Sequence, residues 1–297
     1  MERMTSAAAR PEQVALAVIG GSGFYELEGL QETRTYEIDT PFGKPSTPVL
    51  VGSLNGRRIA FLARHGLGHL LTPTEIPYRA NIFALKAMGV ERIVSVSACG
   101  SLREDFMPGH IVIPDQLYDH TKSRERSFFG GGVVAHVSMP QPFCPDLSAQ
   151  LADALMTMGA VVHQGGTSIT IEGPRFSTKA ESEVFRTWGM SVIGMTAAPE
   201  AFLAREAEIC YCVMAHVTDY DVWHVSAAPV TVEAVIRILN DNTRLAHGAI
   251  QRLASDLSPK RNCDCGSALS GAIITRSAAI PASTFEKLGP LLGKYRA

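Results

Sequence analysis

Two aspartates, Asp219 and Asp221, stand on either side of a tyrosine in "VTDYDVW" (217–223), directly after a long apolar run. Carboxylates two residues apart at the end of a strand are expected on the same face of that strand. Burial and a neighbouring negative charge both raise the pKa of a carboxyl group, so such a pair can keep one proton near neutral pH. The pattern predicts an acid that donates a proton beside a carboxylate that accepts one. Taken alone, it is more typical of two solvated loop aspartates that cap a helix.

Two further segments have residue types that suit an anion. The strand-like "VIGGSGFYEL" (18–27) ends in a glycine-rich turn, where the backbone can approach a phosphate and Ser22 supplies a hydroxyl. It lacks the third glycine of a dinucleotide fingerprint and the lysine of a P-loop, so a simple tight turn is an equal alternative. "FLARHGLGH" (61–69) places Arg64 and His65 at another strand end, as a planar fork and a second donor. Alone, an Arg-His pair is more often exposed on the surface.

Three other segments place small or ring-binding residues at strand ends. "SVSACGSL" (95–102) ends a strand in hydroxyls and glycine, and "IGMTAAPEAFLARE" (193–206) places Met195 and Thr196 before a helix. "TIEGPRFST" (170–178) places Phe176 between a strand and a helix, where it can pack in the core or stack on a flat ring. Ligands of open α/β sheets bind at strand ends, so these residues together predict a pocket for a small anion and its partner.

The elements that must position these residues alternate between strands and helices, which predicts an α/β fold with helices on both faces of a sheet. Several strands are too apolar to have a solvent-exposed face. The strands are expected at 14–20, 58–63, 92–98, 110–114, 168–173, 191–195 and 210–218. The helices are expected at 77–89, at 178–189 with a Thr178–Glu181 capping box, and at 231–257. One domain over 14–257 therefore precedes a looser tail, 258–297, which we expect to pack on the domain or on a neighbouring subunit.

Composition excludes several classes of function. The 297-residue chain is 46% hydrophobic and 19% charged, with a formal net charge of -2, which disfavours a nucleic-acid partner. No apolar stretch approaches the roughly 18 residues of a membrane span. Residues 1–13 lack the apolar core of a secretory signal, so we expect a flexible leader and a cytoplasmic protein.

The six cysteines contain no CxxC pair and no Cys/His cluster of zinc-site spacing, so no metal site is expected. Cys99, Cys210 and Cys212 lie in apolar segments and are expected to be small core residues. Cys263 and Cys265 lie in the tail, either as two reduced thiols or as a strained disulfide or redox-responsive pair.

Nine blocks in order along 14–257 give the chain a resemblance to the nucleoside phosphorylase family, of the trimeric, purine-specific type. The blocks are "GGSG", "DTPFGKPS", "ARHG", "YRANIFALK", "ACGSL", "MPQPFCP", "TIEGPRFS", "GMTAAPEAFLARE" and "TDYDVW". The resemblance implies a single domain with a central twisted mixed β-sheet flanked by helices. It also implies a homotrimer, although some relatives are hexamers, with orthophosphate as a co-substrate and no cofactor or metal.

The resemblance also implies a role for each site residue. Phosphate would be bound by Ser22, Arg64, His65, Ser97, Thr196 and the backbone of Ala98. The nucleoside would be bound by Phe176 against the base, Met195 against the ribose, His136 and Val232 at the 5' group, and Ser177. Asp219 would donate to purine N7 as the catalytic acid, and Asp221 would bind the 6-amino edge.

The implied reaction splits S-methyl-5'-thioadenosine with phosphate into adenine and 5-methylthioribose 1-phosphate, in purine and methionine salvage, with adenosine as a secondary substrate. Family members that act on 6-oxopurines carry an asparagine at the place of the catalytic aspartate, and this chain has Asp219 there. A 6-oxopurine or methylthioinosine phosphorylase on the same fold is the alternative function. A non-catalytic nucleoside-binding module is a more remote one, because it leaves the Arg-His and aspartate pairs unexplained.

Overall fold

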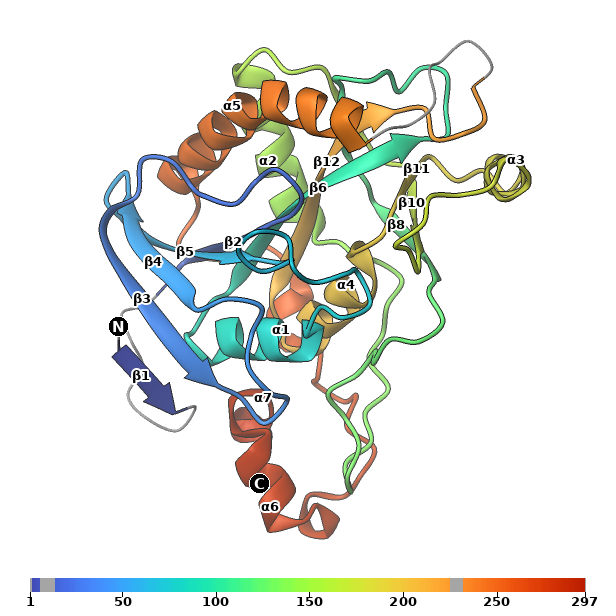
Figure 1. The fold of residues 1–297 in the computed structure, drawn as a ribbon. Coiled ribbons are helices and arrows are strands. Elements are labelled where there is room, and N and C mark those ends of the chain that lie inside the picture. The colour runs from blue at the N-terminus through green and yellow to red at the C-terminus, as the bar shows by residue number, and fades with distance from the viewer. Residues whose placement is uncertain (1, 6–13, 225–231, 297) are drawn as a thin grey trace.

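The computed structural model describes residues 2–5, 14–224 and 232–296, and the side chains of 14–224 and 242–296. A mixed sheet forms its centre (Figure 1), in the order β1-β3-β4-β5-β2-β6-β11-β10-β8, with β12 between β6 and β7, and β9 beside β7. The four strands that matter most for the site run parallel to one another: β2 (Leu16–Gly20), β5 (Arg57–Ala63), β6 (Arg92–Ser101) and β12 (Cys210–Asp219). The others are β1 (Glu2–Thr5), β3 (Gln31–Asp39), β4 (Val49–Leu54), β7 (Ile111–Ile113), β8 (Gln116–His120), β9 (Val162–Gln164), β10 (Thr167–Ile171) and β11 (Val192–Gly194).

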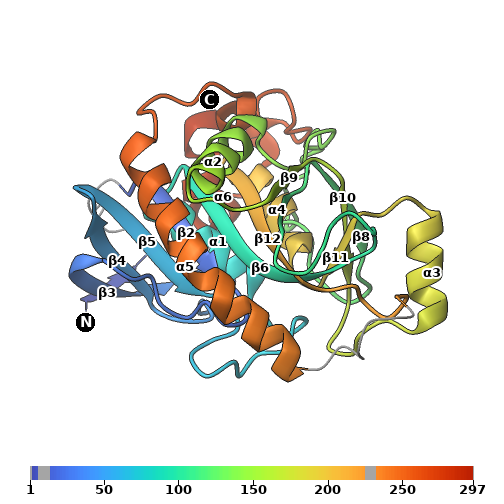
Figure 2. The ribbon, with the colours of Figure 1, turned by 90° about the horizontal axis from the view of Figure 1, so that it is seen from above.

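Helices cover both faces of the sheet, as the apolar strands predict (Figure 2). Along β2, Leu16 and Val18 face the core beneath α2 (Pro145–Thr157) and α5 (Val232–Asp256). Ala17 and Ile19 face the opposite core, which α1 (Tyr78–Ala87), α4 (Ala197–Glu206) and α7 (Gly289–Leu292) cover. The predicted single-domain α/β fold with a mixed sheet is confirmed.

All seven predicted strands and all three predicted helices are present, with boundaries that differ by a few residues. The capping box of α3 (Lys179–Thr187) is also confirmed: the Thr178 hydroxyl accepts from the Glu181 N–H at 3.2 Å, and the Glu181 carboxylate accepts from the Thr178 N–H at 2.7 Å. The prediction missed the hairpin β3–β4 and helix α2. Strand β3 is mostly exposed and polar, so it carries little apolar periodicity.

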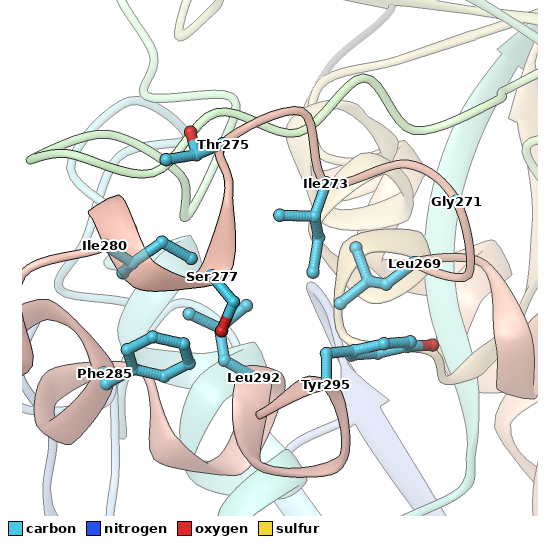
Figure 3. A pocket seen from close by; sticks show the side chains of 9 residues that line it. All are labelled: Leu269, Gly271, Ile273, Thr275, Ser277, Ile280, Phe285, Leu292 and Tyr295. Carbon is cyan, nitrogen blue, oxygen red and sulfur yellow. The ribbon is translucent and has the colours of Figure 1, made fainter. Parts of the chain in front are cut away.

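The two ends of the chain are more ordered than their sequences suggest. The sequence assigns 1–13 to a flexible leader, but Glu2–Thr5 form β1, a parallel edge strand beside β3, and 6–13 lie outside the described residues. The tail contains α6 (Ala282–Lys287) and α7, whose Leu291 and Leu292 join the core beneath α1. A cavity of about 250 Å³ opens within the tail (Figure 3), and its lining includes Ile273, Phe285 and Tyr295. Among the described residues, none of the helices combines the length and the apolar character needed to cross a membrane.

Candidate active site

The register of the parallel strands brings three of the predicted segments to one point. Gly20, the last residue of β2, pairs with Ala63 of β5 and with Val96 of β6. The residues that follow, Gly21, Arg64 and Ser97, therefore meet at the same edge of the sheet. A Cβ on Gly21 would lie 2.8 Å from Arg64 Nη1 and 2.6 Å from the Val96 carbonyl, so only glycine fits there.

Arg64 is buried and forms a two-point ion pair with Glu200 of α4. Its Nε and Nη2 donate to the two Glu200 carboxylate oxygens at 2.8 and 2.9 Å, and Nη2 also donates to Ser95 Oγ at 2.5 Å. Burial disfavours the guanidinium charge, but the charge and hydrogen bonds of Glu200 outweigh it and raise the pKa of Arg64. Tyr211 of β12 donates to the same carboxylate at 2.8 Å. Arg64 is thus a fixed, charge-compensated group, and Nη1 is its part nearest Ser97, at 3.4 Å from Ser97 Oγ.

Hydroxyls lie beside that guanidinium. Ser97 Oγ is 3.5 Å from Thr196 Oγ1, and the Thr196 side chain makes no capping bond to α4. The backbone after Thr196 is not yet regular helix, because Ala198 is extended and its N–H donates to Thr170 Oγ1 at 3.2 Å. The peptide bond from Ala198 to Pro199 is cis. The structure thus brings together Arg64, Ser97, Thr196 and the turn that carries Ser22, with Ala98 next along β6. Hydroxyls and backbone N–H groups, more than net charge, are what this corner offers to an anion.

His65 differs from its expected role as a second donor. Its Nδ1 lies 2.9 Å from the Leu71 carbonyl, which can only accept, so Nδ1 carries a proton in this contact. Burial, followed by the charge of Arg64, lowers the pKa of His65 to about 4. The ring is therefore neutral at pH 7, and its Nε2 is an acceptor that suits the P–OH group of a protonated phosphate.

The aspartate pair is held together by a turn. Asp219 ends β12 opposite Gly100, after a register shift, and Asp221 lies beyond the strand with a φ of 52°. The backbone N–H of Asp221 donates to Asp219 Oδ1 at 2.8 Å. The expectation that strand alternation places both carboxylates on one face is therefore wrong, since the turn performs that task. Gly100 makes room for the pair, because a Cβ there would lie 2.9 Å from Asp219 Oδ1 and 3.2 Å from Asp221 Cβ.

Burial raises the pKa of both carboxyl groups. For Asp219 it outweighs the hydrogen bonds from the Thr218 hydroxyl and the Asp221 N–H, and the charge of Asp221 adds a smaller increase. For Asp221, burial outweighs the opposing effect of the nearby Ser182 and Ser177 hydroxyls. The predicted upward shift is confirmed, and desolvation is its main cause.

The residues expected near the base and sugar lie around the segment between β10 and α3. Phe176 is 42% exposed, so it does not pack in the core. Ser177 is buried and lines a cavity of about 90 Å³ together with Glu172 and Gly173. The Met195 thioether lies against Gly173, where a Cβ would be 2.6 Å from its sulfur.

His136 is not brought to this site, and the position of the Val232 side chain is outside the described residues. His136 is exposed, and its backbone N–H donates to the Ala272 carbonyl at 2.9 Å. The neighbouring residue, Ala135, forms a β-bridge with Ile273 of the tail. That segment runs beside the tail, at the opposite end of the molecule from α3 (Figure 1). Val232 is the first residue of α5, and its side chain lies outside the described residues.

Sequence reasoning missed the buried groups that hold these segments. Arg124 is buried and donates to the carbonyls of Met195, Ala198 and Glu172 at 2.6, 2.7 and 2.7 Å. Burial raises the pKa of Glu172, but hydrogen bonds from Thr74 and from the backbone of 122–123 overcome it and lower the pKa to about 2. The missed partner of Arg64 is Glu200. A lone charged residue in a loop or helix gives no sign of burial, so only its position in the fold could have identified it.

Comparison with known proteins gives concordant matches. The model of the phosphorylase superfamily matches residues 15–255. S-methyl-5'-thioadenosine phosphorylase of Geobacter sulfurreducens is 55% identical over 285 residues, 96% of this chain and 99% of that protein. The protein of the same name from Chloroflexus aurantiacus is 52% identical over 281 residues, 94% of this chain and 98% of that protein. A crystal structure of methylthioadenosine phosphorylase from an antarctic soil metagenomic library has a TM-score of 0.89 at 45% identity, covering 95% of this chain and 100% of that chain.

A structural match from an animal extends this set. Methylthioadenosine phosphorylase from Schistosoma mansoni, solved in complex with adenine, has a TM-score of 0.81 at 34% identity and covers 84% of this chain and 93% of that one.

We expect Glu200→Gln to lower the free energy of unfolding by about 3–5 kcal/mol, because it leaves the buried Arg64 charge without its counter-charge. Urea denaturation followed by far-UV circular dichroism measures the change. The control is Asp256→Asn, which breaks the exposed Arg252–Asp256 pair, at 2.6 Å, and should cost less than about 1 kcal/mol. Equal losses of unfolding free energy in the two variants would show that the buried Arg64–Glu200 pair stabilises the fold no more than the exposed pair does.

Proposed function

The chain belongs to the phosphorylase superfamily, and we infer that it catalyses the phosphorolysis of S-methyl-5'-thioadenosine to adenine and 5-methylthioribose 1-phosphate. The single observation that carries the chemistry is the pair of the partly buried Asp219 and the buried Asp221, both with raised pKa values, beside strand ends lined by hydroxyls and Arg64. Orthophosphate is the co-substrate, and the reaction requires no cofactor.

Phosphorolysis needs no nucleophile from the protein, because phosphate itself attacks the anomeric carbon as the purine leaves. Positive charge develops on the sugar in the transition state, so an oriented phosphate both stabilises that charge and forms the new bond. Ser22, Ser97, Thr196 and the backbone of Ala98 bind the phosphate, with Arg64 Nη1 beside them. The close approach of Ser97 Oγ, Thr196 Oγ1 and Arg64 Nη1 supports this arrangement. His65 accepts a hydrogen bond from the phosphate.

The leaving purine carries negative charge that builds toward N7, and Asp219 neutralises it by donating a proton. Asp221 accepts a hydrogen bond from the 6-amino group of adenine. The acid role rests on the raised pKa of Asp219, and the link from the Asp221 N–H to Asp219 Oδ1 keeps the second carboxyl group beside it. The acceptor role of Asp221 rests on this position beside the acid and on the resemblance to the family. Phe176 packs on the base, Ser177 lies at its edge, and Met195 packs against the ribose.

The chain acts as a homotrimer in the cytoplasm. If His136 serves the 5' group, as the resemblance implies, it does so from a neighbouring copy, because this exposed residue lies away from the site of its own chain. A small apolar pocket favours methylthio over hydroxyl by only roughly 1–3 kcal/mol, so adenosine is a slower substrate.

Substrate comparison tests the function. The purified chain should release adenine from S-methyl-5'-thioadenosine only when phosphate is present, with slower release from adenosine and little release of base from inosine. Liquid chromatography of the base and of the sugar 1-phosphate measures each reaction. Preferred cleavage of inosine would favour the 6-oxopurine phosphorylase, equal cleavage without phosphate would indicate a hydrolase, and binding without cleavage would indicate a binding module.

Asp219→Asn should reduce kcat for S-methyl-5'-thioadenosine by about 10²–10⁴-fold with a much smaller change in KM, because the amide cannot deliver the proton to N7. Steady-state kinetics at saturating phosphate measures both constants. Asp256→Asn, an exposed carboxylate in the last turn of α5, serves as the matched control and should leave both constants unchanged. Undiminished turnover of Asp219→Asn would contradict the acid role.

The pH dependence of kcat gives an independent check. The protonated form of Asp219 is the active one and its pKa is raised, so kcat should be highest below that pKa and decline as rising pH removes the proton. The profile of Asp219→Asn should lack this alkaline decline, although its overall rate is lower. A decline of the same midpoint in both proteins would assign the titration to another group.

A further inference from the structure

Four of the six cysteines meet at a point that the proposed reaction does not use. Cys144, Cys210, Cys263 and Cys265 place their sulfur atoms within 4.8 Å of one another, and all four are free thiols. They come from three separate parts of the chain. Cys144 is the N-cap of α2, Cys210 is the first residue of β12, and the other two lie in the tail at the short 3₁₀ helix Asp264–Ser267.

The geometry points to a tetrahedral metal site, and we propose that these four cysteines bind one zinc ion as a tetrathiolate. A zinc–sulfur bond is about 2.3 Å, so the sulfurs of a tetrahedral site lie about 3.8 Å apart. The Cys210 and Cys263 sulfurs are 3.4 Å apart, and no pair in the cluster exceeds 4.8 Å. Shifts of roughly half an ångström bring all four to the ideal distance, and four soft thiolates in this geometry favour zinc over hard cations.

The surroundings compensate the charge of such a site. Binding converts four thiols and one Zn²⁺ into a complex of charge −2 and releases four protons. Arg205 Nη1 donates to Cys265 Sγ at 3.3 Å, and the Arg261 guanidinium lies against Gly266, where a Cβ would be 2.4 Å from Nη2. The Leu147 N–H, at the start of α2, donates to Cys144 Sγ at 3.5 Å. Two guanidinium groups and a helix N-terminus thus face the thiolates, which is the environment that stabilises sulfur anions.

The site has the character of a structural metal centre. Cys144, Cys210 and Cys265 are buried and Cys263 is partly buried, and four protein ligands leave no open position for a substrate. The ion would join the start of α2, the start of β12 and the tail. The tail then continues into the cavity-bearing segment (Figure 3) and into α7, whose Leu291 and Leu292 join the core. Zinc would fix the tail near its beginning, while apolar packing and the contacts of Lys294 and Tyr295 with Glu208 fix it near its end.

The proposal reverses the expectation of no metal site. That expectation rested on spacing along the sequence, and here the ligands lie up to 121 residues apart, from Cys144 to Cys265. The short Cys263-x-Cys265 spacing was visible, but its two partners are ordinary apolar-segment cysteines until the fold brings them together.

Metal content of the full-length chain tests the proposal without any assay of activity. The protein is purified under reducing conditions from zinc-supplemented medium, and zinc per chain is measured by inductively coupled plasma mass spectrometry after gel filtration. We expect about one zinc per chain, reduced at least about tenfold in Cys263→Ser and in Cys265→Ser. Cys212→Ala is the matched control, because Cys212 is buried in the same strand as Cys210 but lies outside the cluster, and it should keep its zinc.

Cobalt and thiol chemistry separate the remaining outcomes. Refolding with Co²⁺ should produce the intense red-region absorption of a tetrahedral cobalt thiolate, and Cys265→Ser should weaken it. Mass spectrometry after alkylation of the denatured chain counts free thiols. Six alkylated thiols with about one zinc support the proposal. A metal-free chain with disulfides among the four cysteines, or with six free thiols and no zinc after supplementation, overturns it. Neither result bears on the phosphorylase reaction, which the substrate comparison tests separately.

Discussion

The buried ion pair between Arg64 and Glu200 is the interaction on which the rest of the site depends. Arg64 leaves the end of β5, its guanidinium contacts Ser95 and the Val96 carbonyl of β6, and its partner lies on α4. Tyr211 of β12 donates to the same carboxylate. Strands β5, β6 and β12 and the helix after β11 are therefore joined at one buried point. A buried guanidinium without Glu200 would be very costly, so the helix whose N-cap is Thr196 must dock where the pair forms.

Glycine residues make room for the charged side chains at two corners of the site, one at Arg64 and one at the aspartate pair. Gly21 lets the first turn pass against Arg64, and Gly100 lets β6 pass beneath the aspartate pair. A methyl group at either position would meet a charged side chain at less than 3.0 Å. The Arg64 corner and the aspartate corner differ in whether a buried charge is balanced by an opposite charge. The Arg64 corner is compensated by Glu200. Within the described part of the chain, the aspartate corner has two acids and no cation among its hydrogen-bond partners, so burial acts by raising pKa values. One corner is thus suited to hold an anion and the other to hold a proton.

Sequence alone could predict the apolar strands, because the spacing of apolar residues and their proportion indicate burial directly. The order of the short sequence blocks indicated the family. Sequence reasoning placed Arg64, Thr196 and Asp219 at or just beyond strand ends, where the structure has them, whereas Ser97 lies inside β6, which continues to Ser101. It could not predict the buried partners Glu200 and Arg124, since pairing of distant charges depends on which helix packs on which strand. It also misjudged two local effects. The aspartates meet through a turn at Asp221 rather than by strand alternation, and the His65 ring orients its protonated nitrogen toward the Leu71 carbonyl. Both are backbone details that residue types do not encode.

Strand β12 connects the two unusual clusters of the molecule. It begins at Cys210 in the thiol cluster and ends at Asp219 in the aspartate pair. Ten residues of extended strand separate them by about 30 Å. The strand between is buried and paired with β6 along most of its length, so its position is already fixed by the sheet. A metal bound at Cys210 would therefore have little effect on the positions of the two aspartates. Its effect falls on the tail, whose described residues form no strand and are held by apolar packing and by polar contacts such as those of Leu269, Lys294 and Tyr295 with Glu208. The two clusters share a strand, and the proposed metal would fix the end of the chain while the aspartates are proposed to serve the chemistry.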